Sequence, residues 1–263
     1  MRPLDEESLK AIEPENIILL GESHWNREML EFEFEFLKFL NKNYGFRDVV
    51  VEWAKSFQYY VDKCLETEDD TFAPDGLLEG LYENSEGFLR KICEYNKDLE
   101  PEKRIRVWGG DMDHSNTNPA RGLIVSYANR IKNESAKNEI LNFTEEFSRD
   151  NIPEDKSPFL EELGKASNKI KGMMEENRNS LPDKNFDAVI HILKSFEDNG
   201  KCYSFGDETN KFWDEREKMM LKYFEEAYEK SDGKILGIYG GGHVWKAPEW
   251  WEVTSLRNMR SYQ

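Results

Sequence analysis

Two histidines, each placed just after a glycine-containing end of an apolar run, could do acid–base or metal chemistry. The run 17–20 ends in the tetrapeptide Gly-Glu-Ser-His, which places Glu22 two residues before His24. The run 235–239 ends in three glycines followed by His243. Histidine changes its charge near neutral pH, so either side chain could move a proton or bind a metal ion. Glycine lets the backbone turn sharply and approach other groups closely.

Three charged side chains lie at the ends of candidate strands or on an apolar helix face. Glu52 follows three consecutive valines, and Asp111 follows the next candidate strand. Arg216 lies on the apolar stripe of a helix expected over about 208–230. A carboxylate at the end of a buried strand is costly unless it is paired, bound to a metal ion or exposed to water at the rim of the sheet. Arg216 therefore needs an anion, which is either a core carboxylate or a substrate group.

These residues support two chemistries that the sequence does not separate. In the first, His24 is a general base that activates water and is oriented by Glu22 or Glu52. His243 and Arg216 then stabilise the developing oxyanion. In the second, His24, His243 and Glu52 hold a divalent metal ion that activates the water.

The elements that must position these residues follow from the spacing of apolar side chains. Strands are expected at 17–20, 48–53, 104–108 and 235–239. Helices are expected at about 26–43, 56–64, 76–95 and 208–230. The segment over about 119–199 is expected to contain only helices, with breaks near Pro153, Pro158 and Pro182. This alternation predicts an α/β fold with a central, mainly parallel sheet flanked by helices. Parallel strands place their sites at the carboxyl edge, so the candidate residues should meet there.

The bulk properties predict one domain and exclude some partners. The 263 residues suffice for a single α/β domain, 1–263, with a helical insertion or cap at about 133–205. The net charge of −17 argues against nucleic acid and anionic membranes and leaves a small-molecule substrate as the expected partner. The three cysteines include no C-x-x-C pair, which predicts a protein without a disulfide framework. The sequence has no signal-like start and no apolar run long enough to span a membrane, which predicts a cytoplasmic protein.

The order of these motifs resembles a known superfamily. It contains the erythromycin esterase-like hydrolases, the ChaN haem-iron-binding proteins and the TraB/Tiki proteins. The superfamily pattern begins with G-x-x-H and a glutamate that ends the next strand, which are matched here by Gly21–His24 and Glu52. It continues with an E-R-x-x-x-M-like helix and a second G-x-x-H, which are matched by Glu215-Arg216 with Met219-Met220 and by Gly240–His243. The stretch from Gly21 to Trp53 is most similar to the erythromycin esterase branch.

The resemblance implies a hydrolase that attacks an ester, a lactone or a related bond with a histidine base and nearby glutamates. Here those residues would be His24 with Glu22 and Glu52, helped by His243 and Arg216. Typical members carry a glutamate three residues before the first histidine, whereas Glu22 lies two before it. The chain is also shorter than typical macrolide esterases, so the resemblance does not imply a macrolide substrate.

Three other functions stay open at this level. The ChaN branch implies a protein that holds haem or a metal without turnover. The Tiki branch implies a metal-dependent peptidase. The third is a catalytically silent domain that uses the fold for partner contacts.

Overall fold

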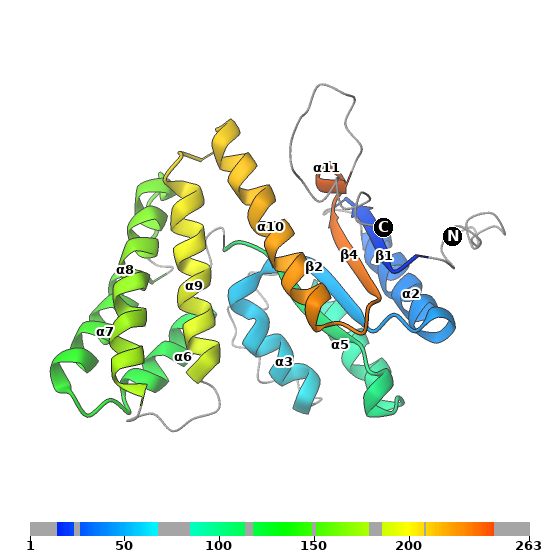
Figure 1. The fold of residues 1–263 in the computed structure, drawn as a ribbon, viewed down its shortest axis with the longest axis horizontal. Helices are drawn as coiled ribbons and strands as arrows, with labels where there is room; N and C mark the ends of the chain where they lie inside the picture. Colours follow the sequence, from blue (N-terminus) through cyan, green and yellow to red (C-terminus); the bar gives the residue numbers. More distant parts are fainter. Residues whose placement is uncertain are drawn as a thin grey trace.

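Four parallel strands form the sheet at the centre of the fold (Figure 1). The computed structural model describes residues 15–23, 27–67, 85–113, 118–148, 151–178, 186–207 and 209–244. The strands are β1 (Ile17–Glu22), β2 (Asp48–Ala54), β3 (Arg106–Asp111) and β4 (Ile235–Gly240). Their order is β1-β4-β2-β3, so the last strand lies between the first two. The predicted α/β fold with a parallel sheet is confirmed.

Helices cover both faces of this sheet. On one face lie α2 (Arg27–Tyr44), α3 (Gln58–Thr67) and α5 (Ser85–Lys97), which share a core with the strands. On the other face lies α10 (Asn210–Lys230), whose buried Met220 and Phe224 pack against Val50 and Tyr239 of the sheet. Consecutive strand residues point to opposite faces, so the run of buried valines in β2 meets helices on both sides.

Glycines on the face toward α10 make room for the large ring of Tyr239. A Cβ added to Gly110 would lie 2.5 Å from the Tyr239 hydroxyl. One added to Gly237 would lie 2.9 Å from Phe224 and 3.1 Å from the Tyr239 ring. Glycine at these two positions therefore lets Tyr239 lie across the sheet from β4 toward β3, beneath α10.

A second core lies beside the sheet. It is built by α6 (Asn118–Ala128), α7 (Glu134–Glu146), α8 (Lys156–Glu176) and α9 (Phe186–Tyr203). Gly164 and Gly200 let α8 and α9 approach closely, since a Cβ on Gly164 would lie 2.6 Å from the Cα of Gly200. Phe212, Met219 and Tyr223 of α10 join this core, which ties it to the sheet. Helices occupy the segment expected as an insertion, and its role as a cap stays a prediction.

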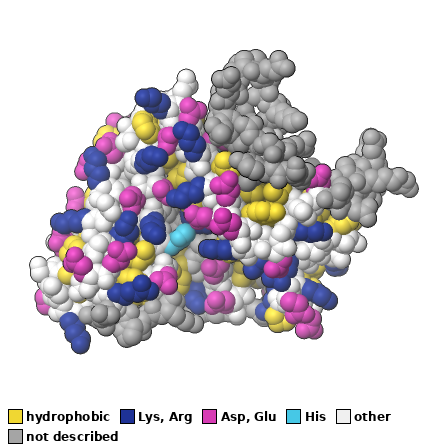
Figure 2. Space-filling view, viewed as in Figure 1, with side chains coloured by type: hydrophobic (Ala, Val, Ile, Leu, Met, Phe, Trp, Pro, Cys, Tyr) yellow, Lys and Arg dark blue, Asp and Glu magenta, His cyan; other side chains and the backbone are white. Residues whose placement is uncertain are grey.

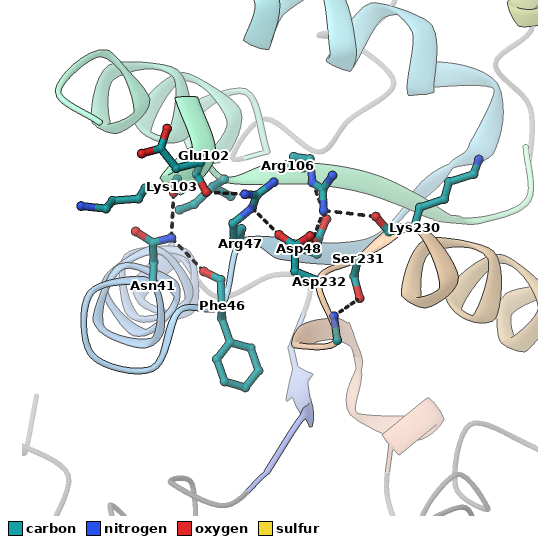
Figure 3. Close-up of polar contacts among 12 residues, drawn as sticks. Asn41, Phe46, Arg47, Asp48, Glu102, Lys103, Arg106, Lys230, Ser231 and Asp232 are labelled. Carbon is teal, nitrogen blue, oxygen red and sulfur yellow. Dashed lines mark hydrogen bonds and ion pairs between the residues drawn. The ribbon is translucent and has the colours of Figure 1, made fainter. Parts of the chain in front are cut away.

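The amino edge of the sheet is tied together by polar contacts (Figure 3). Arg106 donates two hydrogen bonds of 2.8 Å to the fully buried Asp48, and a third of 3.2 Å to the Lys230 carbonyl. Arg47 pairs with Asp232 at 3.1 Å. These contacts join β2, β3 and the end of α10, so this edge is a structural anchor.

Some local predictions need correction. Pro158 does not break a helix, because it lies in the first turn of α8, where backbone N–H groups need no helical partner. The helix expected at 76–95 is observed only as α5, and residues 76–84 lie outside the described residues. The second G-x-x-H is not a plain turn, since the four residues Gly241–Val244 form the short helix α11.

The sequence predictions about disulfides and membrane-spanning segments can also be compared with the structure. Cys64, Cys93 and Cys202 are buried thiols, and Cys93 Sγ lies 3.8 Å from the Cys64 carbonyl oxygen. Among the described residues, no helix has the length and apolarity needed to span a membrane.

Candidate active site

The carboxyl ends of the four strands bring most of the candidate residues to one edge. The register pairs Glu22 of β1 with Gly240 of β4, which leads directly into α11 and His243. Asp111 ends β3 and pairs with Ala54 of β2. The expectation that these segments meet at one rim is confirmed for the described residues.

Glu52 lies where the pairing between β2 and β3 is irregular. The register shifts between Val51 and Ala54, and such a bulge re-aims side chains at the end of a strand. Glu52 Oε2 accepts a 2.6 Å hydrogen bond from the Gly240 N–H, and Oε1 accepts one of 2.8 Å from Arg216 Nη2. The Glu52 side chain is only 8% exposed. Its carboxylate therefore joins β2, β4 and α10.

Arg216 is buried and bound to two carboxylates. Its Nε and Nη2 donate to the two oxygens of Asp111 at 3.1 and 2.5 Å, in addition to the bond to Glu52. Burial opposes its charge, but Asp111 and Glu52 raise the pKa of Arg216 above its usual value. The sequence left open whether its anion is a core carboxylate or a substrate. The structure gives it two core carboxylates.

His243 is held between two glutamates. Its Nδ1 contacts Glu217 Oε1 in a short hydrogen bond, and its Nε2 lies 3.4 Å from Glu52 Oε1. Burial disfavours the charged ring, but the hydrogen bonds and charges of Glu217 and Glu52 raise the pKa of His243 to about 9. At neutral pH His243 is therefore an imidazolium that can donate from both nitrogens.

Glu217 is a site residue that the sequence reasoning missed. It follows Arg216 directly on α10. Its contact with His243 joins α10 to α11 across 26 residues of sequence. A glutamate beside a buried arginine on an amphipathic helix was the available signal.

The charges of this cluster nearly balance. Glu52, Asp111 and Glu217 supply three carboxylates, and Arg216 and His243 supply two positive charges. Burial opposes the charge of Glu52, but its hydrogen bond to His243 and the charges of His243 and Arg216 hold the pKa of Glu52 below its usual value. Such a preorganised charge network in a partly buried site is typical of catalytic centres.

Two of the predicted residues are less defined. His24 lies outside the described residues, so its place relative to this cluster stays a prediction. Glu22 is half-buried at the end of β1, beside Gly240, so it lies at the carboxyl edge of the sheet. Asp113, which follows β3, is buried and accepts hydrogen bonds from Ser56 at 2.5 Å and Ser195 at 3.0 Å.

Two members of the predicted metal set of His24, Glu52 and His243 lie within the described residues. Glu52 uses one oxygen for Arg216 and the other for the Gly240 N–H. The two ring nitrogens of His243 contact the carboxylates of Glu217 and Glu52. Within the described ranges, no group of three or more His, Cys, Asp or Glu residues is arranged to hold a metal ion. His24, the third member of the predicted set, lies outside the described residues, so the metal site stays a prediction.

Replacing Glu217 with glutamine is expected to lower the pKa of His243 from about 9 toward the ordinary histidine value near 6.5. The reason is that the variant loses a carboxylate bonded to Nδ1. NMR titration of the ring protons measures this pKa. Glu225→Gln, which changes an exposed glutamate on the same helix, is the control and should leave the pKa unchanged. Equal titration of all three proteins would contradict the assignment.

Comparison with known proteins identifies the fold. No protein-family model matches the sequence, and no curated protein is significantly similar to it. A Bacillus cereus crystal structure is similar with a TM-score of 0.68 and 18% identity, over 98% of this chain and 67% of that one. A succinoglycan biosynthesis protein has a TM-score of 0.62 and 16% identity, over 91% of this chain and 60% of that one.

An erythromycin esterase mutant, EreC in its open conformation, is also similar. The TM-score is 0.63 at 15% identity, over 94% of this chain and 66% of that one. The chain thus spans 60–67% of the length of these three structures. The likeness shows an erythromycin esterase-like fold.

Proposed function

We propose that this chain is a hydrolase of the erythromycin esterase-like type, which cleaves an ester, a lactone or a related bond of a small molecule. The observation that carries the proposal is the placement of His243, whose two ring nitrogens contact Glu217 and Glu52 beside the Arg216–Asp111 pair. A charged donor fixed at the carboxyl edge of a parallel sheet suits a reaction that develops negative charge on oxygen.

In the proposed reaction His24 acts as the general base. It takes a proton from water, and the hydroxide attacks the carbonyl carbon to give a tetrahedral oxyanion. The proton then passes from His24 to the leaving alkoxide as the carbon–oxygen bond breaks. The products are an alcohol and a carboxylic acid, which releases its proton to solvent and becomes a carboxylate, and His24 returns neutral. A base must be unprotonated at the working pH, so the charged His243 is unsuited to this role and His24 is preferred.

The other residues have distinct proposed roles. The Nε2–H of His243 faces Glu52 over a long 3.4 Å contact, and we assign it to the oxyanion when substrate enters. Arg216 positions Glu52 and adds positive charge, since its hydrogen bonds already go to two carboxylates. Asp111 fixes Arg216. Glu52 and Glu22 both remain candidates for orienting His24.

The first experiment is hydrolysis by the purified wild-type chain. It is expected to release product from 4-nitrophenyl acetate and to open a simple γ-lactone well above the buffer rate, with turnover retained in EDTA. Retention in EDTA is expected because the proposed base, His24, and the proposed oxyanion donor, His243, act without a metal ion.

Two other results would redirect the assignment. Loss of turnover in EDTA with recovery on adding zinc would support the metal-assisted alternative. Absence of turnover on both probes, together with a haem absorbance band that is lost in His243→Ala, would overturn the hydrolase and favour the binding protein.

A further inference from the structure

Trp213 lies on the side of α10 that faces the sheet, one turn before the Arg216 and Glu217 of the candidate active site. Positions 213, 216, 217, 220 and 224 follow the three- and four-residue spacing that keeps side chains on one side of a helix. Met220 and Phe224 pack on the sheet, and Arg216 and Glu217 bind the groups at its carboxyl edge. Trp213 lies one turn further toward the start of α10, which extends beyond the strands (Figure 1).

The Trp213 ring is fixed but uncovered. It is 40% exposed, whereas Arg216 one turn later is 6% exposed. The Arg216 guanidinium carbon lies 5.5 Å from the ring centroid, and the Phe212 ring meets it edge-on at 5.2 Å. Hydrophobic side chains form only small, separate areas on the face in Figure 2. An oriented indole beside the reacting groups is therefore available to contact a ligand.

Glu217 supplies a second, independent observation. Its Oε1 binds His243, while its buried Oε2 has no hydrogen-bond partner among the described residues. A buried acceptor without a donor is costly and is satisfied in most structures. A donor supplied by a group that enters the site would satisfy it. Glu217 follows Trp213 by four residues, so acceptor and ring lie on the same side of α10.

We propose that Trp213 and Glu217 form a subsite for a sugar ring, so that the bond cleaved is an O-acyl ester of a saccharide. The C–H face of a pyranose would stack on the indole, and a ring hydroxyl would donate to Glu217 Oε2. The reaction converts the sugar ester and water into the free hydroxyl, a carboxylate and a proton. The cleavage of a sugar ester rests on the proposed hydrolase function, whereas the binding of a sugar ring by Trp213 and Glu217 does not.

Saturation-transfer NMR with methyl β-glucoside and methyl β-galactoside tests the binding without turnover. Wild type and Trp213→Phe are expected to saturate the ring protons of at least one of the two glycosides. Trp213→Ala and Trp213→Leu should lose about 80% or more of that signal, since neither offers a flat ring face. The control is Phe205→Ala, which removes a 37% exposed aromatic ring from the turn before α10 and should keep the signal.

Kinetics test the consequence for the reaction. Trp213→Ala should lower kcat/KM about tenfold for glucose pentaacetate, mainly through KM, and less than twofold for trifluoroethyl acetate, which has no ring. Equal effects on both esters, or glycoside signals unchanged in Trp213→Ala, would overturn the subsite. Saturation of 2-naphthoate in place of both glycosides would overturn the sugar assignment. Glycoside binding through Trp213 without hydrolysis of any ester would keep the subsite and reject the hydrolase.

Discussion

Arg216→Met is expected to lower the free energy of unfolding by about 3–5 kcal/mol, the usual cost of removing one partner from a buried ion pair. Asp111 and Glu52 are 3% and 8% exposed at their side chains, so both would be left charged and uncompensated. Methionine keeps much of the volume, which limits any effect of an empty cavity. Urea denaturation followed by circular dichroism gives the free energy.

A matched control separates burial from charge. Arg178 pairs with Asp187 at 3.1 Å, but the two side chains are 62% and 80% exposed. Arg178→Met is therefore expected to cost less than about 1 kcal/mol. If the two arginine variants lose similar stability, Arg216 is not the centre of a buried charge network.

His24→Ala is expected to lower kcat for ester hydrolysis by about 10²–10⁴-fold, the typical contribution of a general base. Its free energy of unfolding should stay within about 0.5 kcal/mol of wild type, because the proposed role of His24 is in the reaction and not in the core. Rate measurements on 4-nitrophenyl acetate and urea denaturation of the same preparations provide both numbers.

The neighbouring Ser23→Ala is the control for His24. Ser23 is exposed just after β1, one residue before His24, and its variant should keep both rate and stability. A His24→Ala protein that is folded and turns over at the wild-type rate would exclude His24 as the base. A variant that loses stability together with activity would indicate a structural histidine.

The stability of the protein should depend on the charge of His243. Its pKa in the folded state is raised from 6.5 to about 9, so the folded state binds the proton more tightly than the unfolded chain does. This contribution to stability is complete below pH 6.5 and disappears as the pH rises to about 9. In Glu217→Gln, the free energy of unfolding should fall less than in wild type as the pH rises through the same range.

The sequence predicted the features that depend on local patterning. The three valines before Glu52 predicted a buried strand, and the apolar stripe of α10 predicted that Arg216 needs an anion. The carboxyl edge followed from the parallel order of the strands.

Other features depend on how distant elements pack, which residue patterns alone do not determine. The insertion of β4 between β1 and β2 decides that Gly240 meets Glu52. The irregular pairing after Val51 aims Glu52 at Arg216. The contact of Glu217 with His243 depends on the rotation of α10 relative to α11.

The pH dependence of kcat/KM for ester hydrolysis tests the central claim most directly, because it reports the base and the charged donor together. Wild type is expected to gain activity as the base loses its proton and to lose activity above about pH 9, where His243 becomes neutral. In Glu217→Gln the descending limb should move to lower pH. A descending limb at the same pH in both proteins, or turnover that keeps rising beyond pH 10, would contradict the account.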